Sequence, residues 1–171
     1  MSDMIFINAK GLDRIGRDLG ATAAQISPAM RTAVSRVTKW AGNEASRRIS
    51  KATKVTGKVL KGRMRVEVMG RDGVLGRVWA GLQNVPLKAM KPRQTKSGVT
   101  AGPAKRPGAF ISKKLGGHVF ERVGKERLPI KKSEGINILD HGLDAMGSLE
   151  KEIGERLQRE FESQLKWQMS K

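Results

Sequence analysis

The most concentrated chemistry in this chain is cationic. The segment from Lys88 to Pro107 is rich in Gly, Pro, Ser and Thr and has six basic residues and no acid. These six are Lys88, Lys91, Arg93, Lys96, Lys105 and Arg106. Ammonium and guanidinium groups bind phosphate oxygens and carboxylates, and no acid within the segment competes for them. We therefore expect this segment to contact DNA phosphates or an acidic groove on a partner protein, with a solvated loop as the alternative.

Residue types that support catalysis are present but lack the necessary spacing. Neither His118 nor His141 has a metal-binding partner four residues away, and no serine lies in a Gly-x-Ser-x-Gly elbow. His118 follows a Gly-Gly pair and opens an expected strand, which is typical of a structural histidine. The chain has no cysteine, which excludes disulfides and thiolate metal sites. We expect no enzyme activity, cofactor, metal or small-molecule ligand.

The charge of the whole chain is lopsided. Its 171 residues have a net charge of +18, and the sequence pI is near 10.9. The last segment, from Leu139 to Lys171, has seven acids and five bases, so the excess lies in residues 1–138. A field of this size attracts polyanions, and the asymmetry predicts one basic surface and one near-neutral or acidic element. No apolar run is long enough to span a membrane, and the first residues do not resemble a secretion signal, so we expect a soluble protein made in the cytoplasm.

Helical periodicity marks both ends of the chain. Apolar residues recur at helical spacing over 12–26, and a second stripe predicts an amphipathic helix near 28–52. Ser27-Pro28 predicts that this helix begins there or that the first one bends. A third stripe, from Leu139 to Leu165, predicts a helix near 140–169.

Between these helices the apolar period changes to two. Strands are predicted near 63–69, 74–82, 108–112, 118–123 and 128–132. The turn Gly70-Arg71-Asp72-Gly73 joins the first two into a hairpin. This order predicts one α+β domain over 1–171, in which a small antiparallel sheet of about five strands packs on long N- and C-terminal helices. Its parts are a helical region at 12–52, a sheet at 63–132 and a C-terminal helix at 139–169. Residues 88–107 have little to bury, so we expect a basic arm that is mobile until assembly.

A series of short motifs follows in one order through the middle of the chain. The motifs are Trp79-Ala80-Gly81-Leu82, Val85-Pro86-Leu87, Arg93-Gln94-Thr95-Lys96-Ser97-Gly98-Val99, Gly108-Ala109-Phe110-Ile111, Gly117-His118-Val119-Phe120-Glu121-Arg122 and Leu128-Pro129-Ile130. Over roughly residues 30–135 the series resembles the prophage minor tail protein Z family of long-tailed bacteriophages. Of these residues, we expect Trp79 and Phe110 to be sheet-face core residues, and Gly81 and Gly108 to allow close backbone approach at strand ends.

The resemblance implies a virion structural protein at the head-proximal end of the tail, acting in tail completion and in joining the tail to the head. It implies a ring around the DNA channel, hexameric by the sixfold symmetry of such tails, which contacts neighbouring tail and connector proteins. Mutual repulsion of basic subunits opposes self-association until a partner or DNA neutralises them. A free nucleic-acid-binding protein without sequence preference is the alternative. It would act through phosphates, because aromatics are only 4% of the chain and no tyrosine is present to stack on bases.

Overall fold

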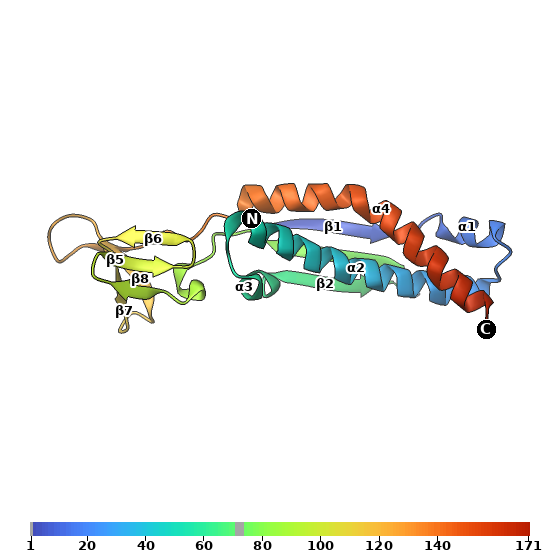
Figure 1. Cartoon of the computed structure of the whole chain (residues 1–171), viewed down its shortest axis with the longest axis horizontal. Coiled ribbons are helices and arrows are strands. Elements are labelled where there is room, and N and C mark those ends of the chain that lie inside the picture. The colour runs from blue at the N-terminus through green and yellow to red at the C-terminus, as the bar shows by residue number, and fades with distance from the viewer. Residues whose placement is uncertain (1, 71–73) are drawn as a thin grey trace.

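Two 31-residue helices, α2 (Ala23–Thr53) and α4 (Leu139–Met169), pack along each other through most of the length of the molecule (Figure 1). The computed structural model describes residues 2–70 and 74–171. Apolar residues at four-residue spacing on α4 are fully or almost fully buried: Leu149, Ile153, Leu157, Phe161 and Leu165. On α2 the buried stripe consists mainly of alanine and valine, whose small side chains allow the helices to approach closely. Both predicted long helices are confirmed.

The start of α2 differs from the prediction. The helix begins at Ala23, five residues before the proline, and Pro28 lies inside it. At the N-terminus the Thr22 backbone N–H donates to Gln25 Oε1 at 3.0 Å, which satisfies a donor that the helix leaves open. This cap fixes the start before Pro28, which lies past the first turn and therefore removes one hydrogen bond, that to the Ala24 carbonyl. A short helix, α1 (Leu12–Asp18), precedes it.

A three-stranded antiparallel sheet lies against the two long helices. Its strands are β1 (Ser2–Asn8), β2 (Met64–Met69) and β3 (Leu75–Gly81), in the order β1-β3-β2. Ile5 and Val66 both pair with the buried Val78, and α2 and α4 cover this face. The β2–β3 pairing confirms the predicted hairpin, although residues 71–73 of its turn lie outside the described residues. Strand β1 was not among the strands predicted from the sequence.

The remaining strands lie at one end of the molecule, beyond the helices (Figure 1). They are β4 (Arg93–Thr95), β5 (Gly98–Ala101), β6 (Ala104–Pro107), β7 (Phe110–Ser112), β8 (His118–Arg122) and β9 (Ile130–Lys132), with a 3₁₀ turn at Leu87–Met90. They form two further antiparallel sheets, β4-β5-β6 and β7-β8-β9. We call Leu87–Lys132 the β lobe and the rest of the described chain the body, which also contains the short helix α3 (Gly57–Lys61).

The prediction of one sheet of about five strands is therefore wrong, although the α+β class is correct. Three sheets of three strands replace it. The physical reason is that β1 occupies the second edge of β3, so that β3 cannot pair with the later strands, and none of these pairs with the outer edge of β2. The later strands have only three to five residues and bury a small core of their own, in which Val99, Ala101 and Val119 are almost fully covered.

The expectation of a mobile arm at 88–107 is also wrong. This segment forms the 3₁₀ turn and the meander β4-β5-β6, with Val99 opposite both Gln94 and Arg106. The ladder hydrogen bonds and the burial of Val99, Ala101 and Met90 provide the ordering energy that the composition did not indicate.

One antiparallel bridge joins the β lobe to the body. Val85 and Ile136 exchange two backbone hydrogen bonds of 2.8 Å, and Val85 is fully buried. The two chain segments that enter and leave the lobe are thus fixed side by side. Among the helices of the described chain, none is both long enough and apolar enough to cross a membrane.

Candidate polyanion interface on the β lobe

The fold gathers unneutralised positive charge on the β lobe. Thirteen of the 34 basic residues lie there, but only two of the 16 acids, Glu121 and Glu126. The bases are Lys88, Lys91, Arg93, Lys96, Lys105, Arg106, Lys113, Lys114, Arg122, Lys125, Arg127, Lys131 and Lys132. No ion pair within 4.0 Å involves a residue of the lobe in the part of the chain that the structure describes. These cations therefore depend on solvent ions or on a partner for neutralisation.

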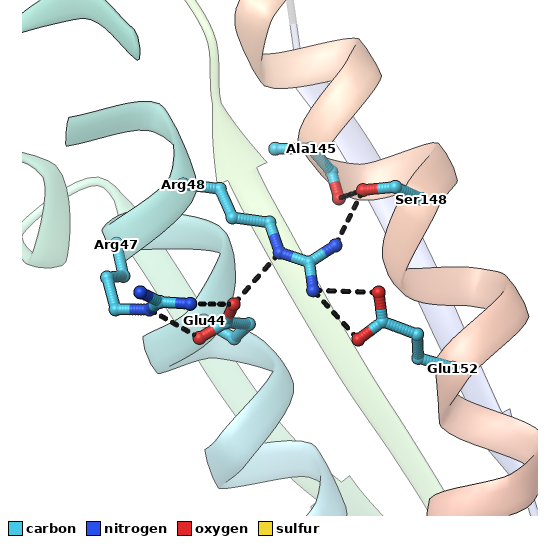
Figure 2. A network of polar contacts seen from close by, with 6 residues as sticks. All are labelled: Glu44, Arg47, Arg48, Ala145, Ser148 and Glu152. Atoms are coloured by element: carbon cyan, nitrogen blue, oxygen red, sulfur yellow. Dashed lines mark hydrogen bonds and ion pairs between the residues drawn. The ribbon is translucent and has the colours of Figure 1, made fainter. Parts of the chain in front are cut away.

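In the body, by contrast, bases and acids are paired across the long helices. Figure 2 shows the Arg48 guanidinium of α2 between two carboxylates. Its Nε donates to Glu44 Oε1 at 2.9 Å, and its Nη2 donates to both carboxylate oxygens of Glu152 on α4, at 2.7 and 2.8 Å. Its Nη1 donates to Ser148 Oγ at 2.7 Å, so one side chain connects α2 to α4 at two positions.

Glu44 responds to this network. Its carboxylate accepts hydrogen bonds from Arg47 at 2.7 and 2.6 Å in addition to the bond from Arg48. The hydrogen bonds from Arg47 are the largest cause that lowers the pKa of Glu44, and Arg48 adds to them. Burial opposes the shift, and the resulting pKa is about 2. Acidic residues of the body thus form ion pairs with basic residues of the body.

Five of the six basic residues predicted as contacts are exposed; only Arg106 is half-buried. Arg93 on β4 and Lys105 on β6 both pair with Thr100 of the central strand, so they flank it on one face of the sheet. The opposite face carries the buried Val99. The meander thus brings together two cations that are twelve residues apart in the sequence.

Arg106 lies on the inner face, as the register partner of Val99, and is less available to a ligand. Its Nη2 donates to the Glu134 carbonyl at 3.3 Å, while its Nε is buried without a hydrogen-bond partner. Arg106 therefore fixes the end of the lobe against the chain that returns to the body.

Gln94, which from the sequence was only one residue of the motif series, links strands of the two lobe sheets. Its Oε1 accepts the Ile111 N–H at 3.0 Å, and its Nε2 donates to the Gly98 and Ala109 carbonyls at 2.9 and 3.2 Å. The amide thus joins β4 to β7 and sets the two lobe sheets against each other. A glutamine within a basic strand is the only sequence signal of this role.

The family-like residues in the body lie at the open face of the first sheet. Trp79 is half-buried rather than part of the core, because alternation along β3 directs Val78 and Ala80 inward and Trp79 outward. Arg65 of β2 lies over its ring, 5.3 Å from Cζ to the centroid. Gly81 agrees with the expected close approach, since a Cβ there would lie 3.0 Å from the Trp79 ring.

Two expectations in the lobe need correction. Gly108 has a φ of +71°, and nothing lies within 4 Å of a Cβ built on it, so its conformation, not close approach, requires glycine. Phe110 is half-buried and not a core residue. It stacks on Phe120 of β8, and Arg122 lies over its ring.

The two remaining family-like residues, His118 and Pro129, support the ends of the last sheet. His118 opens β8, and its pKa is lowered by burial first and then by the nearby Lys132 and Lys88. Both effects favour the neutral imidazole. The Pro129 carbonyl accepts the Val123 N–H at 3.1 Å after a cis Leu128–Pro129 bond, beside the start of β9.

Comparison of the chain with family models, with curated proteins and with solved structures gives no match.

Proposed function

We propose that this chain is a bacteriophage virion protein, a minor tail or tail-completion subunit at the head-proximal end of the tail. It is a structural protein and not an enzyme. One observation carries the proposal: a β lobe with thirteen bases, two acids and no internal ion pair projects from a body that contains every ion pair of the described residues. A subunit of this kind has a self-sufficient scaffold and a lobe built to meet a polyanion.

The motif series supports the choice among polyanion-binding proteins. Its resemblance to the minor tail protein Z family covers the lobe, including the Arg93–Val99 segment. In a ring around the DNA channel, the exposed cations of β4 and β6 would meet DNA phosphates or an acidic groove on a neighbouring tail or connector protein. The subunit would be located in the virion after synthesis in the host cytoplasm.

Assembly of a ring requires that the positive charge of the subunits be neutralised or screened. Several subunits of charge +18 repel each other, so assembly needs the tail end, DNA or high salt to screen them. We expect a monomer at low salt and oligomers, hexamers by the symmetry of such tails, when the charge is screened. Mass measurement of the purified protein at low and high salt tests this. A monomer at every salt concentration that also forms no rings on tails would contradict the ring.

The decisive experiment is complementation in the phage or prophage that encodes the chain. Particles made without this gene should appear in electron micrographs as complete heads separated from tails. Supplying Lys91→Ser, Arg93→Ser and Lys96→Ser together should give fewer joined particles than the parent chain. Lys10→Ser, Arg14→Ser and Lys39→Ser remove the same charge from exposed positions of the body and should restore joining. Joined, infectious particles without the gene would refute the function.

The unpaired cations of the lobe also favour a second candidate, a free nucleic-acid-binding protein without sequence preference. Such a protein would bind duplex DNA through phosphates, with an affinity that falls steeply with salt. Genomic neighbourhood separates the two candidates: capsid and tail genes on both sides support the tail protein, and their absence supports the free binding protein.

A further inference from the structure

The last sheet of the β lobe has one face in the core and one face open. On the core side, Val119 of β8 is almost fully buried, and its register partner Ile111 of β7 packs against the core. Because side chains alternate along a strand, Phe110 and Phe120 lie on the other face. They are register partners, and both are half-buried.

The two rings form one aromatic surface. Their centroids are 6.3 Å apart, and their planes differ by 30°. Large apolar rings gain most when they are buried in a core, so a pair on an open face leaves stabilising area unused. The chain has only seven aromatic residues, and the fold places two of them together here.

Cations surround this surface. Arg122 of β8 lies over the Phe110 ring, with its Cζ 5.7 Å from the centroid, and Lys132 of β9 is the register partner of Phe120. The acid of these three strands, Glu121, pairs in register with Lys131 and lies on the opposite face by alternation. His118 continues the open face along β8, beside Ser112, and the positive charges nearby favour its neutral ring.

We propose that this face, formed by Phe110, Phe120, Arg122 and Lys132, binds single-stranded nucleic acid. One base stacks on each phenyl ring, with the Arg122 guanidinium leaving the Phe110 ring to bind a backbone phosphate, as the Lys132 ammonium also does. In a duplex the bases already stack on each other and present no free ring face, so this surface discriminates between single strands and duplexes. An acidic protein segment would use the cations but gain little from the rings. The site does not rest on the proposed role in the tail.

The test is fluorescence anisotropy of the full-length protein with a labelled single strand of about fifteen nucleotides and with a hairpin duplex of the same charge. We expect tighter binding of the single strand. The double variant Phe110→Leu, Phe120→Leu keeps apolar side chains but removes the ring faces. Because stacking contributes about 1–3 kcal/mol per base, single-strand affinity should fall about 10-fold or more. Duplex affinity should change less than about threefold, because phosphate contacts remain.

Two controls make the result specific. Phe6→Leu removes an exposed ring, 55% accessible, from the open face of the body and should leave both affinities unchanged. Phe120→Trp keeps a stacking surface and should keep single-strand affinity, which tests the site independently if the double variant does not fold. The double variant Arg122→Gln, Lys132→Gln should weaken binding of both the single strand and the duplex and should make the affinity less dependent on salt concentration.

The outcomes are distinct. If oligo(dT) binds more tightly than oligo(U), the ligand is DNA; if oligo(U) binds more tightly, it is RNA. Tighter binding of either one than of the duplex supports the site. Equal loss of single-strand and duplex binding in the leucine variant overturns it, as does no loss at all. Tighter binding of polyglutamate than of the single strand assigns the face to an acidic protein and also overturns the proposal. Failure here leaves the complementation result unaffected.

Discussion

The body and the β lobe differ in whether their charged side chains form ion pairs. In the body, Arg48 bridges Glu44 and Glu152 across two helices, and every ion pair of the described residues lies there. In the lobe, Arg93 and Lys105 stand beside a threonine on an open sheet face without a carboxylate. Long helices bring acids and bases together at three- and four-residue spacing and across the helix pair, whereas short strands that share few acids do not. The lobe's charge is therefore available for binding.

The largest effect is expected in the core of the body, where the buried and the open face of the elements differ most. Phe161→Ala in α4 removes a fully buried ring at the contact between α4 and α1. The cavity and the lost burial should lower the free energy of unfolding by about 3–5 kcal/mol. Urea denaturation measures this loss. Phe6→Ala, on the open face of β1, is the control and should change stability far less; equal losses would remove the distinction between core and open face.

One polar side chain links the two lobe sheets, in addition to the small apolar core that they share. Gln94→Ala leaves the Ile111 N–H and the Ala109 carbonyl without their partner. These hydrogen bonds are exposed or half-buried, so their loss should cost about 0.5–1.5 kcal/mol. Hydrogen exchange should show faster exchange of the Ile111 amide, with the α2 and α4 amides still protected. Gln158→Ala removes an exposed hydrogen bond to Glu162 in α4 and should have little effect.

The Glu44 network makes the body sensitive to acid. The pKa of Glu44 is about 2 in the folded protein, against 4.5 for an unperturbed glutamate. The stabilisation of the fold by the ionised Glu44 is therefore fully present above pH 4.5. It is lost progressively as the pH falls from 4.5 towards 2, because protonation breaks the bonds from Arg47 and Arg48. Glu44→Gln should therefore lower stability at pH 7 by on the order of 1–2 kcal/mol and reduce the acid dependence.

Urea midpoints at pH 7, 4 and 2.5 test this dependence. The gap between the parent chain and Glu44→Gln should narrow as the pH falls. The exposed Glu155, which has no ion pair in the described structure, provides the matched control through Glu155→Gln. A gap that stays constant with pH would show that Glu44 acts through packing and not through its charge.

The smallest effect is expected in the lobe. Changing Lys91, Arg93 and Lys96 together to Ser removes three exposed cations that hold no ion pair. Stability should change by less than about 0.5 kcal/mol, or rise slightly as repulsion falls. Thermal unfolding at low salt measures this change. A loss of several kcal/mol in the free energy of unfolding would mean that the cations of the lobe stabilise the fold and are not free for binding.

The sequence by itself determined the elements whose apolar period is long or strictly alternating. The helices α2 and α4, the hairpin β2–β3, and the strands β7, β8 and β9 follow from local patterns, because burial of one face fixes the period. The excess of base over acid in residues 85–132 is likewise a property of the sequence. These features needed no knowledge of partners in space.

Only the tertiary structure decided which strands share a sheet and which side chains meet. β1 takes the edge of β3 through pairing across some seventy residues, a choice that no local pattern contains. The segment 93–107 is ordered because Val99 and Ala101 are buried where β5 packs against β7 and the Leu87–Met90 turn. The open aromatic face exists because β7 and β8 pair Phe110 with Phe120 in register. Local patterns fix the faces of each element, but long-range pairing alone fixes which faces are covered and which are left for a partner.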